Sequence, residues 1–245
     1  ASVTRIAERT TAGGLNGMLA RISLSLDKVE QRQAATLTGL EKRIDTRARR
    51  IRSVLADLGI DNGHAGAVGG PFVPVKPPQS GASAFERQLY RINIARVQID
   101  RYSHKLVAVP VRKPVVGEVD MSSPFGMRMD PFLGRPAVHT GIDLRGEVGE
   151  PVRATATGRV TIAGREGGYG NMVEISHGNS LATRYGHLSE INVKNGQIVR
   201  IGEVVGRIGS TGRSTAPHLH YETRVNGEAV DPQKFLRAGL RLGDV

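Results

Sequence analysis

The first part of the chain carries an apolar repeat that is too long for a single compact core. From about Leu15 to Leu58, apolar residues recur three and four positions apart, with polar and charged residues between them. This spacing predicts a long amphipathic helix with coiled-coil patterning, although the step from Val29 to Leu37 across Gln33 breaks the strict heptad. Such a helix would run on the order of 65 Å, because each residue adds about 1.5 Å.

A second helix is predicted after a break. Gly59 stands where a helix C-cap glycine is expected, and about residues 59–82 form a linker rich in Gly and Pro. An apolar stripe then runs from Phe85 to Leu106, with Ser83 as the expected N-cap. Two such helices favour an antiparallel hairpin, so we expect residues 1–109 to form a helical, coiled-coil-like region.

The helical apolar pattern ends at Pro110 and Pro114. We interpret residues 110–119 as a proline-containing joint between two regions. Short β-branched segments bounded by glycine follow at close intervals and predict an all-β domain of tight hairpins. We place this domain at residues 120–236 and a C-terminal tail at 237–245. The expected fold class is therefore a multidomain α+β chain, with a long helical hairpin before an all-β domain.

Composition limits the function classes. The 245 residues include 39% hydrophobic residues, enough for a core, and zero cysteines, which excludes disulfides and thiolate metal sites. A formal net charge of +11 indicates attraction to a polyanion: nucleic acid, anionic lipid or an anionic cell wall. Aromatic residues make up 4% and tryptophan is absent, which argues against nucleic acid as the partner because such modules usually stack bases on aromatic rings.

Histidines and one aspartate form the strongest candidate for chemistry. In an extended strand, side chains two positions apart share a face, so His218 and His220 would present both imidazoles to one cleft. His139 and Asp143, four positions apart, can meet at one cation if a turn leads into a strand. Two imidazoles and one carboxylate suit Zn²⁺ and leave a fourth tetrahedral position open, which is typical of a catalytic site.

Three motifs together resemble the M23 (lysostaphin, LytM) zinc metallopeptidases, which cut peptide cross-links in bacterial cell walls. The motifs are His139-x-x-x-Asp143, Tyr185-Gly-His187-Leu188 and His218-x-His220. Each is weak by itself, but the three occur in family order and at family spacing, over roughly residues 120–236. The resemblance implies a domain related to the duplicated barrel-sandwich hybrid, and it does not extend to the helical region.

The resemblance also implies roles for single residues. His139, Asp143 and His220 would bind Zn²⁺, and His187 and His218 would be catalytic, with the choice of general base left open. The implied function is a zinc endopeptidase acting on peptidoglycan cross-links, and we prefer a D,D-endopeptidase for the direct D-Ala to diaminopimelate bond. We expect His177 to be structural, and His64 and His104 to need no chemical role.

Two other functions fit parts of the pattern. A non-catalytic LytM-like activator of another wall hydrolase would share the fold, but such proteins have usually lost ligands that this chain keeps. A phosphotransfer module of the glucose-permease type also pairs histidines on a β-face, but it explains neither Asp143 nor the helices. Bound metal and digestion of cross-linked wall separate these hypotheses.

The sequence of the helical region is compatible with three roles: an arm that restricts access to the site, a docking surface for an envelope or divisome regulatory protein, and a stalk that forms a homodimer. We expect a periplasmic or cell-envelope location. The chain begins at Ala1 without a signal-peptide pattern, so we expect any export signal or membrane anchor to lie upstream.

Overall fold

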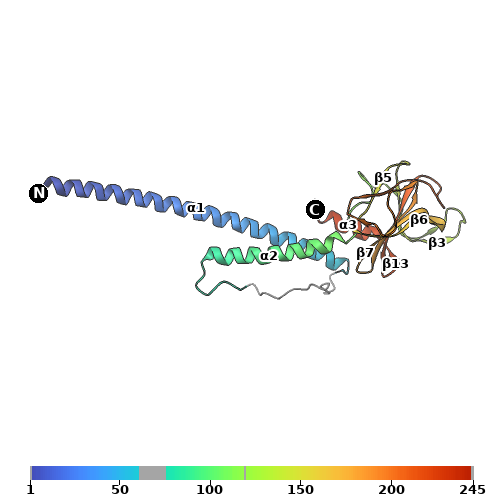
Figure 1. The fold of residues 1–245 in the computed structure, drawn as a ribbon, viewed down its shortest axis with the longest axis horizontal. Helices are drawn as coiled ribbons and strands as arrows, with labels where there is room; N and C mark the ends of the chain where they lie inside the picture. The colour runs from blue at the N-terminus through green and yellow to red at the C-terminus, as the bar shows by residue number, and fades with distance from the viewer. Residues whose placement is uncertain (1, 61–75, 119, 244–245) are drawn as a thin grey trace. The chain divides into compact units, whose positions relative to one another are not determined.

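The computed structural model describes residues 2–60, 76–118 and 120–243 (Figure 1). These residues fall into two compact units. The described part of the helical unit comprises residues 2–49 and 76–100. The β-rich unit comprises the end of the first helix from Arg50 and the chain from Arg101 onwards. None of the helices in these described ranges combines the length and hydropathy needed to span a bilayer.

Both predicted helices are present. Helix α1 spans Ser2–Asp57, so it begins well before Leu15, and helix α2 spans Ala84–Val107. Gly59 ends α1 with a φ of 73°, and the Ile60 N–H donates to the Leu55 carbonyl (2.9 Å), as expected for a glycine C-cap. Most of the linker predicted at 59–82 lies outside the described residues.

The start of α2 is held by a capping box. The Glu86 N–H donates to Ser83 Oγ (3.2 Å), and Glu86 Oε2 accepts in return from the Ser83 N–H (2.7 Å), which confirms Ser83 as the N-cap. Within the helical unit, Arg91 Nε contacts Glu41 Oε1 at 2.7 Å and Gln88 Nε2 donates to Thr38 Oγ1 (2.9 Å). These contacts pair the early turns of α2 with the middle of α1.

The β-rich unit is built from three antiparallel sheets. The largest has eight described strands in the order β1-β4-β12-β8-β7-β6-β10, with β13 paired to β12. Its strands are β1 Met121–Ser123, β4 Ile142–Arg145, β6 Gly158–Glu166, β7 Gly170–Gly178, β8 Leu181–Leu188, β10 Ile198–Val199, β12 His218–Val225 and β13 Glu228–Val230. In the second sheet, β11 (Val204–Arg207) lies between β5 (Pro151–Arg153) and β9 (Glu190–Ile191). In the third, β2 (Gly126–Met129) pairs with β3 (Pro136–His139).

The largest core lies inside this β structure. Buried aliphatic side chains from β4, β6, β7, β8, β11 and β12 pack around Tyr185 and Tyr221, neither of which is exposed to solvent. The two phenol groups are satisfied by threonines, since Tyr185 Oη and Tyr221 Oη each lie 3.0 Å from Thr155 Oγ1. Burial of this kind is the main stabilising term for a small β domain, and it fixes the strands that carry the histidine motifs.

A second core, which we call the base cluster, joins both helix ends to the β structure within the same unit. Its buried residues are Ile51, Val54, Leu55, Leu106, Val109, Val111, Leu181, Phe235, Ala238 and Leu242. The last three belong to or follow helix α3 (Pro232–Leu240). Backbone bonds reinforce the contact, because the Arg153 N–H donates to Pro114 O (2.8 Å) and the Thr157 N–H to Val107 O (2.9 Å).

The base cluster changes the interpretation of two predicted boundaries. The segment expected as a joint, residues 110–119, contains the buried side chains of Val111 and Val115. The boundary expected at residue 236 falls inside α3, so the residues that follow it begin as helix rather than tail. The physical reason is the amphipathic pattern of α3, which turns Phe235 and Ala238 toward the helix ends.

The close approach of α3 to the joint segment yields a stability prediction. A Cβ added at Gly239 would overlap the Val111 carbonyl oxygen, whereas a Cβ at Gly164 in β6 would meet nothing within 4 Å. We expect Gly239→Ala to lower the free energy of unfolding by about 1–3 kcal/mol through overpacking. Gly164→Ala, the matched control, should change it by less than about 0.5 kcal/mol. Chemical denaturation followed by circular dichroism measures both, and equal stability of the two variants would contradict the packing described.

Candidate metal centre and surrounding histidines

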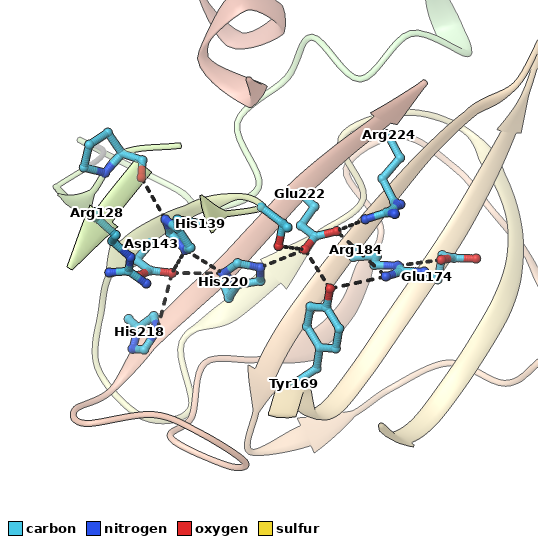
Figure 2. Close-up of polar contacts among 12 residues, drawn as sticks. Arg128, His139, Asp143, Tyr169, Glu174, Arg184, His218, His220, Glu222 and Arg224 are labelled. Carbon is cyan, nitrogen blue, oxygen red and sulfur yellow. Dashed lines mark hydrogen bonds and ion pairs between the residues drawn. The ribbon is translucent and has the colours of Figure 1, made fainter. Parts of the chain in front are cut away.

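Three potential metal-ligand atoms converge in a buried position of the β-rich unit (Figure 2). His139 Nε2 lies 3.1 Å from Asp143 Oδ1 and 3.1 Å from His220 Nδ1. The third side of this triangle, from His220 Nδ1 to Asp143 Oδ1, is 3.0 Å. The structure therefore brings together the three residues predicted as ligands, two from neighbouring strands and His220 from a strand that is distant in the sequence.

Strand pairing explains how these side chains meet. His139 is the last residue of β3, and β4 follows after two residues with Asp143 as its second residue. In the sheet, β12 lies between β4 and β8, and His220 pairs directly with Asp143 on one side and with Gly186 on the other. Directly paired residues point to the same face of a sheet, so the register alone sets His220 beside Asp143.

Gly141 leaves room for the His220 ring, and Gly186 lies beside the same side chain. A Cβ at Gly141 would lie 2.9 Å from His220 Cε1, whereas a Cβ at Gly186 would lie at an ordinary contact distance of 3.5 Å from His220 Cβ. The first distance is too short for a real contact, so Gly141 keeps the space that the ring occupies. These glycines belong to the first and second motifs of the sequence.

Hydrogen bonds to the outer ring nitrogens set the histidine tautomers. His139 Nδ1–H donates to Pro124 O (2.8 Å), and His220 Nε2–H donates to Glu222 Oε1 (3.1 Å). Because the outer nitrogens carry these protons, the inner nitrogens, His139 Nε2 and His220 Nδ1, carry lone pairs. Both lone pairs point toward the Asp143 carboxylate. Three acceptors facing each other are unfavourable unless a cation lies between them.

The spacing of the three atoms fits a small divalent ion. Ligands at about 2.0–2.1 Å from a tetrahedral Zn²⁺ lie roughly 3.3 Å from one another, close to the observed separations. Outer partners of the kind provided by Pro124 and Glu222 are typical of metal-binding histidines, because they fix the ring orientation and raise the basicity of the ligand nitrogen. The donor set thus fits a metal by number, type and spacing.

Ionisation of these groups is consistent with a cation site. Burial opposes the charge on Asp143, but hydrogen bonds with His139 and His220 outweigh it and hold the pKa of Asp143 well below its usual range. Burial likewise opposes a charge on His220, but its bonds to Asp143 and Glu222 raise the pKa of His220 above its usual value. In the absence of a metal ion, a proton on His220 therefore supplies positive charge. A metal ion that binds His220 would displace this proton.

Glu222 is the functional residue that the sequence reasoning missed. Its side chain is completely buried, and besides His220 it accepts from Tyr169 Oη (2.8 Å), Arg224 Nη1 (2.6 Å) and the Thr140 hydroxyl. Burial opposes its ionisation, but the bonds from His220 and Thr140 lower the pKa of Glu222 to about 2. The signal was available, because Glu222 continues the alternation of His218 and His220 along the same strand face.

A charged network keeps Glu222 ionised and in place (Figure 2). Arg184 lies 2.7 Å from Glu174 and 3.9 Å from Glu222, and its guanidinium group is 5.5 Å from the centre of the Tyr169 ring. Tyr169 therefore contacts both the arginine and the carboxylate. A buried carboxylate with several donors remains charged, so His220 faces a full negative charge on its outer side.

The two histidines predicted to be catalytic lie beside the metal centre. The ring centres of His187 and His218 are 4.8 Å apart. His187 Nδ1–H donates to Thr211 O (2.8 Å) and His218 Nδ1–H to Ala216 O (2.7 Å), which leaves both Nε2 atoms unprotonated. His218 Nε2 lies 3.5 Å from Asp143 Oδ1, so one of these acceptors sits next to the ligand cluster.

His187 reaches the site through an irregularity in its strand. Opposite the single residue Met172 of β7, strand β8 contains both Gly186 and His187, which is a β-bulge. His187 has a φ of 60°, a conformation that is uncommon for a residue with a Cβ. The bulge keeps Tyr185 and Leu188 in the core while His187 turns out of it. Burial lowers the pKa of His187 to about 4, so the ring is neutral at neutral pH.

The three candidate ligands, together with His187 and His218, line one open pocket of about 240 Å³. Arg128 forms part of its wall, where it donates to Ser123 Oγ (2.8 Å) and lies 3.4 Å from Asp143 Oδ2. On another side, Arg213 contacts Asp130 at 2.6 Å and stacks over the Phe132 ring, 4.7 Å from its centre. The pocket therefore combines a candidate cation site, two further imidazoles and basic side chains.

Of the other histidines that the structure describes, His104 and His177 lie outside this cluster. His177 is buried between Thr157 O (2.9 Å) and Thr183 Oγ1 (2.9 Å), behind the tyrosines of the core. This is the structural role predicted for it. His64 lies outside the described residues.

Comparison with known proteins agrees with this geometry. Residues 137–232 match the model of peptidase family M23. A DD-carboxypeptidase/endopeptidase, Mpg, of Neisseria meningitidis serogroup B is 56% identical over 112 residues, 46% of this chain and 26% of the relative. The peptidoglycan DD-endopeptidase ShyA of Vibrio cholerae is 44% identical over 124 residues, 50% of this chain and 29% of the relative.

Among solved structures, a zinc-containing peptidase from Vibrio cholerae is similar, with 38% identity and a TM-score of 0.47 over 49% of this chain and 38% of that one. Residues 137–232 of the chain form a peptidase family M23 domain. The chain spans little more than a quarter of the length of the two curated relatives.

The role of Glu222 can be tested through metal affinity. Glu222→Gln keeps the size of the side chain and removes its charge, so we expect Zn²⁺ to bind about 10–100-fold more weakly. Glu174→Gln is the matched control, because Glu174 also pairs with Arg184 but does not contact His220. Competition with a chelator measures the dissociation constants, and circular dichroism confirms the fold. Equal zinc affinity of Glu222→Gln and the parent chain would show that the charge of Glu222 does not act on the metal centre.

Proposed function

We propose that this chain is a zinc-dependent endopeptidase that hydrolyses the peptide cross-links of bacterial peptidoglycan, as a D,D-endopeptidase. The observation that carries the proposal is the convergence of His139, Asp143 and His220 beside the two unprotonated Nε2 atoms of His187 and His218, in one open pocket of an M23 domain. Each part has a role in amide hydrolysis, and the pocket provides all of them together.

The choice of zinc rests on the donors. Two imidazole nitrogens and one carboxylate oxygen form the set found in catalytic zinc sites, where three protein ligands leave room for water and substrate. When bound, Zn²⁺ supplies Lewis acidity and makes water a nucleophile near neutral pH. The absence of cysteine removes the thiolate ligands that structural zinc sites use most.

The histidines provide proton transfer. His187 and His218 both donate Nδ1–H to backbone carbonyls, so each has a single free acceptor, Nε2, which faces the pocket. A neutral imidazole can take a proton from attacking water at that atom and, once charged, hydrogen-bond the oxyanion or protonate the leaving amine. His218 is our candidate for the general base, because its Nε2 lies 3.5 Å from Asp143 Oδ1, beside the ligand cluster.

The proposed substrate is supported by the relatives and by charge. The name of Mpg describes a DD-carboxypeptidase/endopeptidase, and the name of ShyA describes a peptidoglycan DD-endopeptidase. The formal charge of +11 favours binding to an anionic wall through long-range attraction. Together these support a location outside the cytoplasm, which we propose to be the periplasm or cell envelope.

The direct test is digestion of purified cross-linked sacculi, with mass spectrometry of the released muropeptides. The proposal expects cross-linked dimers to be converted to monomers with a new D-Ala carboxyl group, and it expects loss of this conversion when zinc is removed by a chelator. Release of products cut in the glycan or at another peptide bond would contradict the assigned bond. No digestion by the zinc-loaded chain, with stimulation of a second hydrolase instead, would identify an activator rather than an enzyme.

Two variants test the proposed catalytic histidines. We expect His187→Ala and His218→Ala to retain one equivalent of zinc and the fold, because neither residue is in the ligand triangle. Turnover should fall by about 10²-fold or more in each, since an acid-base or oxyanion group is lost. His177→Ala is not a suitable control because its ring is buried, so Arg165→Ala, an exposed substitution in β6, serves instead. Normal turnover in either histidine variant would remove that residue from the mechanism.

A further inference from the structure

Helix α1 carries an apolar stripe that the described residues of the helical unit leave exposed. The stripe consists of Leu15, Leu19, Ile22, Leu26 and Val29, whose side chains are 45–59% exposed. The contacts that pair α2 with α1 involve Thr38 and Glu41, further along α1. Five large apolar side chains on one face of a helix are costly to leave in water, so the stripe indicates a binding surface.

The spacing of the stripe specifies the kind of surface. Its members are separated by four, three, four and three residues, a strict 3.5-residue period over two heptads. A helix that packs on a sheet or a globular surface needs a wider stripe with a period near 3.6, whereas this narrow seam fits another helix in a coiled coil. Leu24 is also exposed, at 57%, but it lies off the seam.

We infer that the α1 stripe binds the same stripe of a second copy of this chain, as a parallel, in-register two-stranded coiled coil. The seam continues to Gln33, four residues after Val29, and this position sets the orientation. In a parallel pair, Gln33 meets Gln33 of the second copy, and the two amides can hydrogen-bond to each other. In the antiparallel register that keeps all five apolar residues in the seam, Val29 faces Leu19 and Gln33 faces Leu15, so the Gln33 amide is buried without a partner, which is unfavourable.

The residues that flank the seam permit self-association. In the parallel register, Met18 faces Ser23, Ser25 faces Glu30, and Arg32 faces Leu37 of the second copy. No like charges meet, so no repulsion opposes pairing of identical helices despite the high net charge of the chain.

The area of the stripe is sufficient for a dimer of moderate stability. Each side chain exposes about 100 Å², so five in each of two copies remove on the order of 1,000 Å² of apolar surface from water. Flanking side chains and backbone bring the contact into the range of specific interfaces, about 1,200–2,000 Å². The dimer would carry two M23 domains, a stoichiometry that the proposed enzymatic function neither requires nor excludes.

The mass of the full chain in solution tests the inference. Sedimentation equilibrium over about 1–100 µM should give a dimer for the parent chain. The double variant Leu19→Glu/Leu26→Glu should be monomeric, because charges at the seam repel, with an increase of at least about 100-fold in the dissociation constant. Leu24→Glu, equally exposed but off the seam, is the matched control and should remain dimeric. A monomeric parent chain, or a dimer that the double variant leaves intact, would overturn the inference.

Cross-linking tests the orientation. Because the chain has no cysteine, Val29→Cys introduces a single thiol. In the parallel register the two thiols lie opposite each other and should form a disulfide under mild oxidation. In the antiparallel register Val29 would face Leu19, and ten residues at about 1.5 Å each would separate the thiols by roughly 15 Å. A dimer that does not cross-link through this position would overturn the parallel arrangement.

Discussion

The chemistry of this chain depends on three lone pairs that face each other across about 3 Å. Strand pairing places His220 beside Asp143, and the turn before β4 brings in His139. The Pro124 carbonyl and the Glu222 carboxylate then fix the ring protons on the outside. Because such an arrangement is repulsive without positive charge, the protein has in effect built a cation site, and the remaining pocket is organised around it.

The sheet serves this site on both sides. On one side, Tyr185, Tyr221 and the threonines that bind them form a closed polar network in an otherwise apolar core, which fixes the strands in register. On the other, Arg184 and Arg224 hold Glu222 charged, so negative charge reaches the metal centre through the His220 ring. The ligand strand β12 therefore has its position determined by packing and its electrostatics by salt bridges.

Much of this could be predicted from the sequence. The period of the apolar residues predicts both helices, and the short glycine-bounded segments predict the β domain. The alternation of side chains along a strand predicts that His218 and His220 share a face. His187 could not be placed this way, because a β-bulge and a positive φ turn it out of the regular alternation. The sequence predicts a tail after residue 236, whereas α3 continues past it. Local sequence does not reveal this, because α3 is held by contacts with the helix ends, which are distant in the sequence.

We expect His139 Nε2, Asp143 Oδ1 and His220 Nδ1 to bind one zinc ion. A crystal structure of the zinc-loaded chain, with anomalous data collected at the zinc absorption edge, tests this directly. It should show one strong anomalous peak about 2.0–2.2 Å from each of these three atoms, with His187 and His218 outside bonding distance. A peak bonded to His187 or His218, or reached through His220 Nε2 with Glu222 displaced, would contradict this expectation.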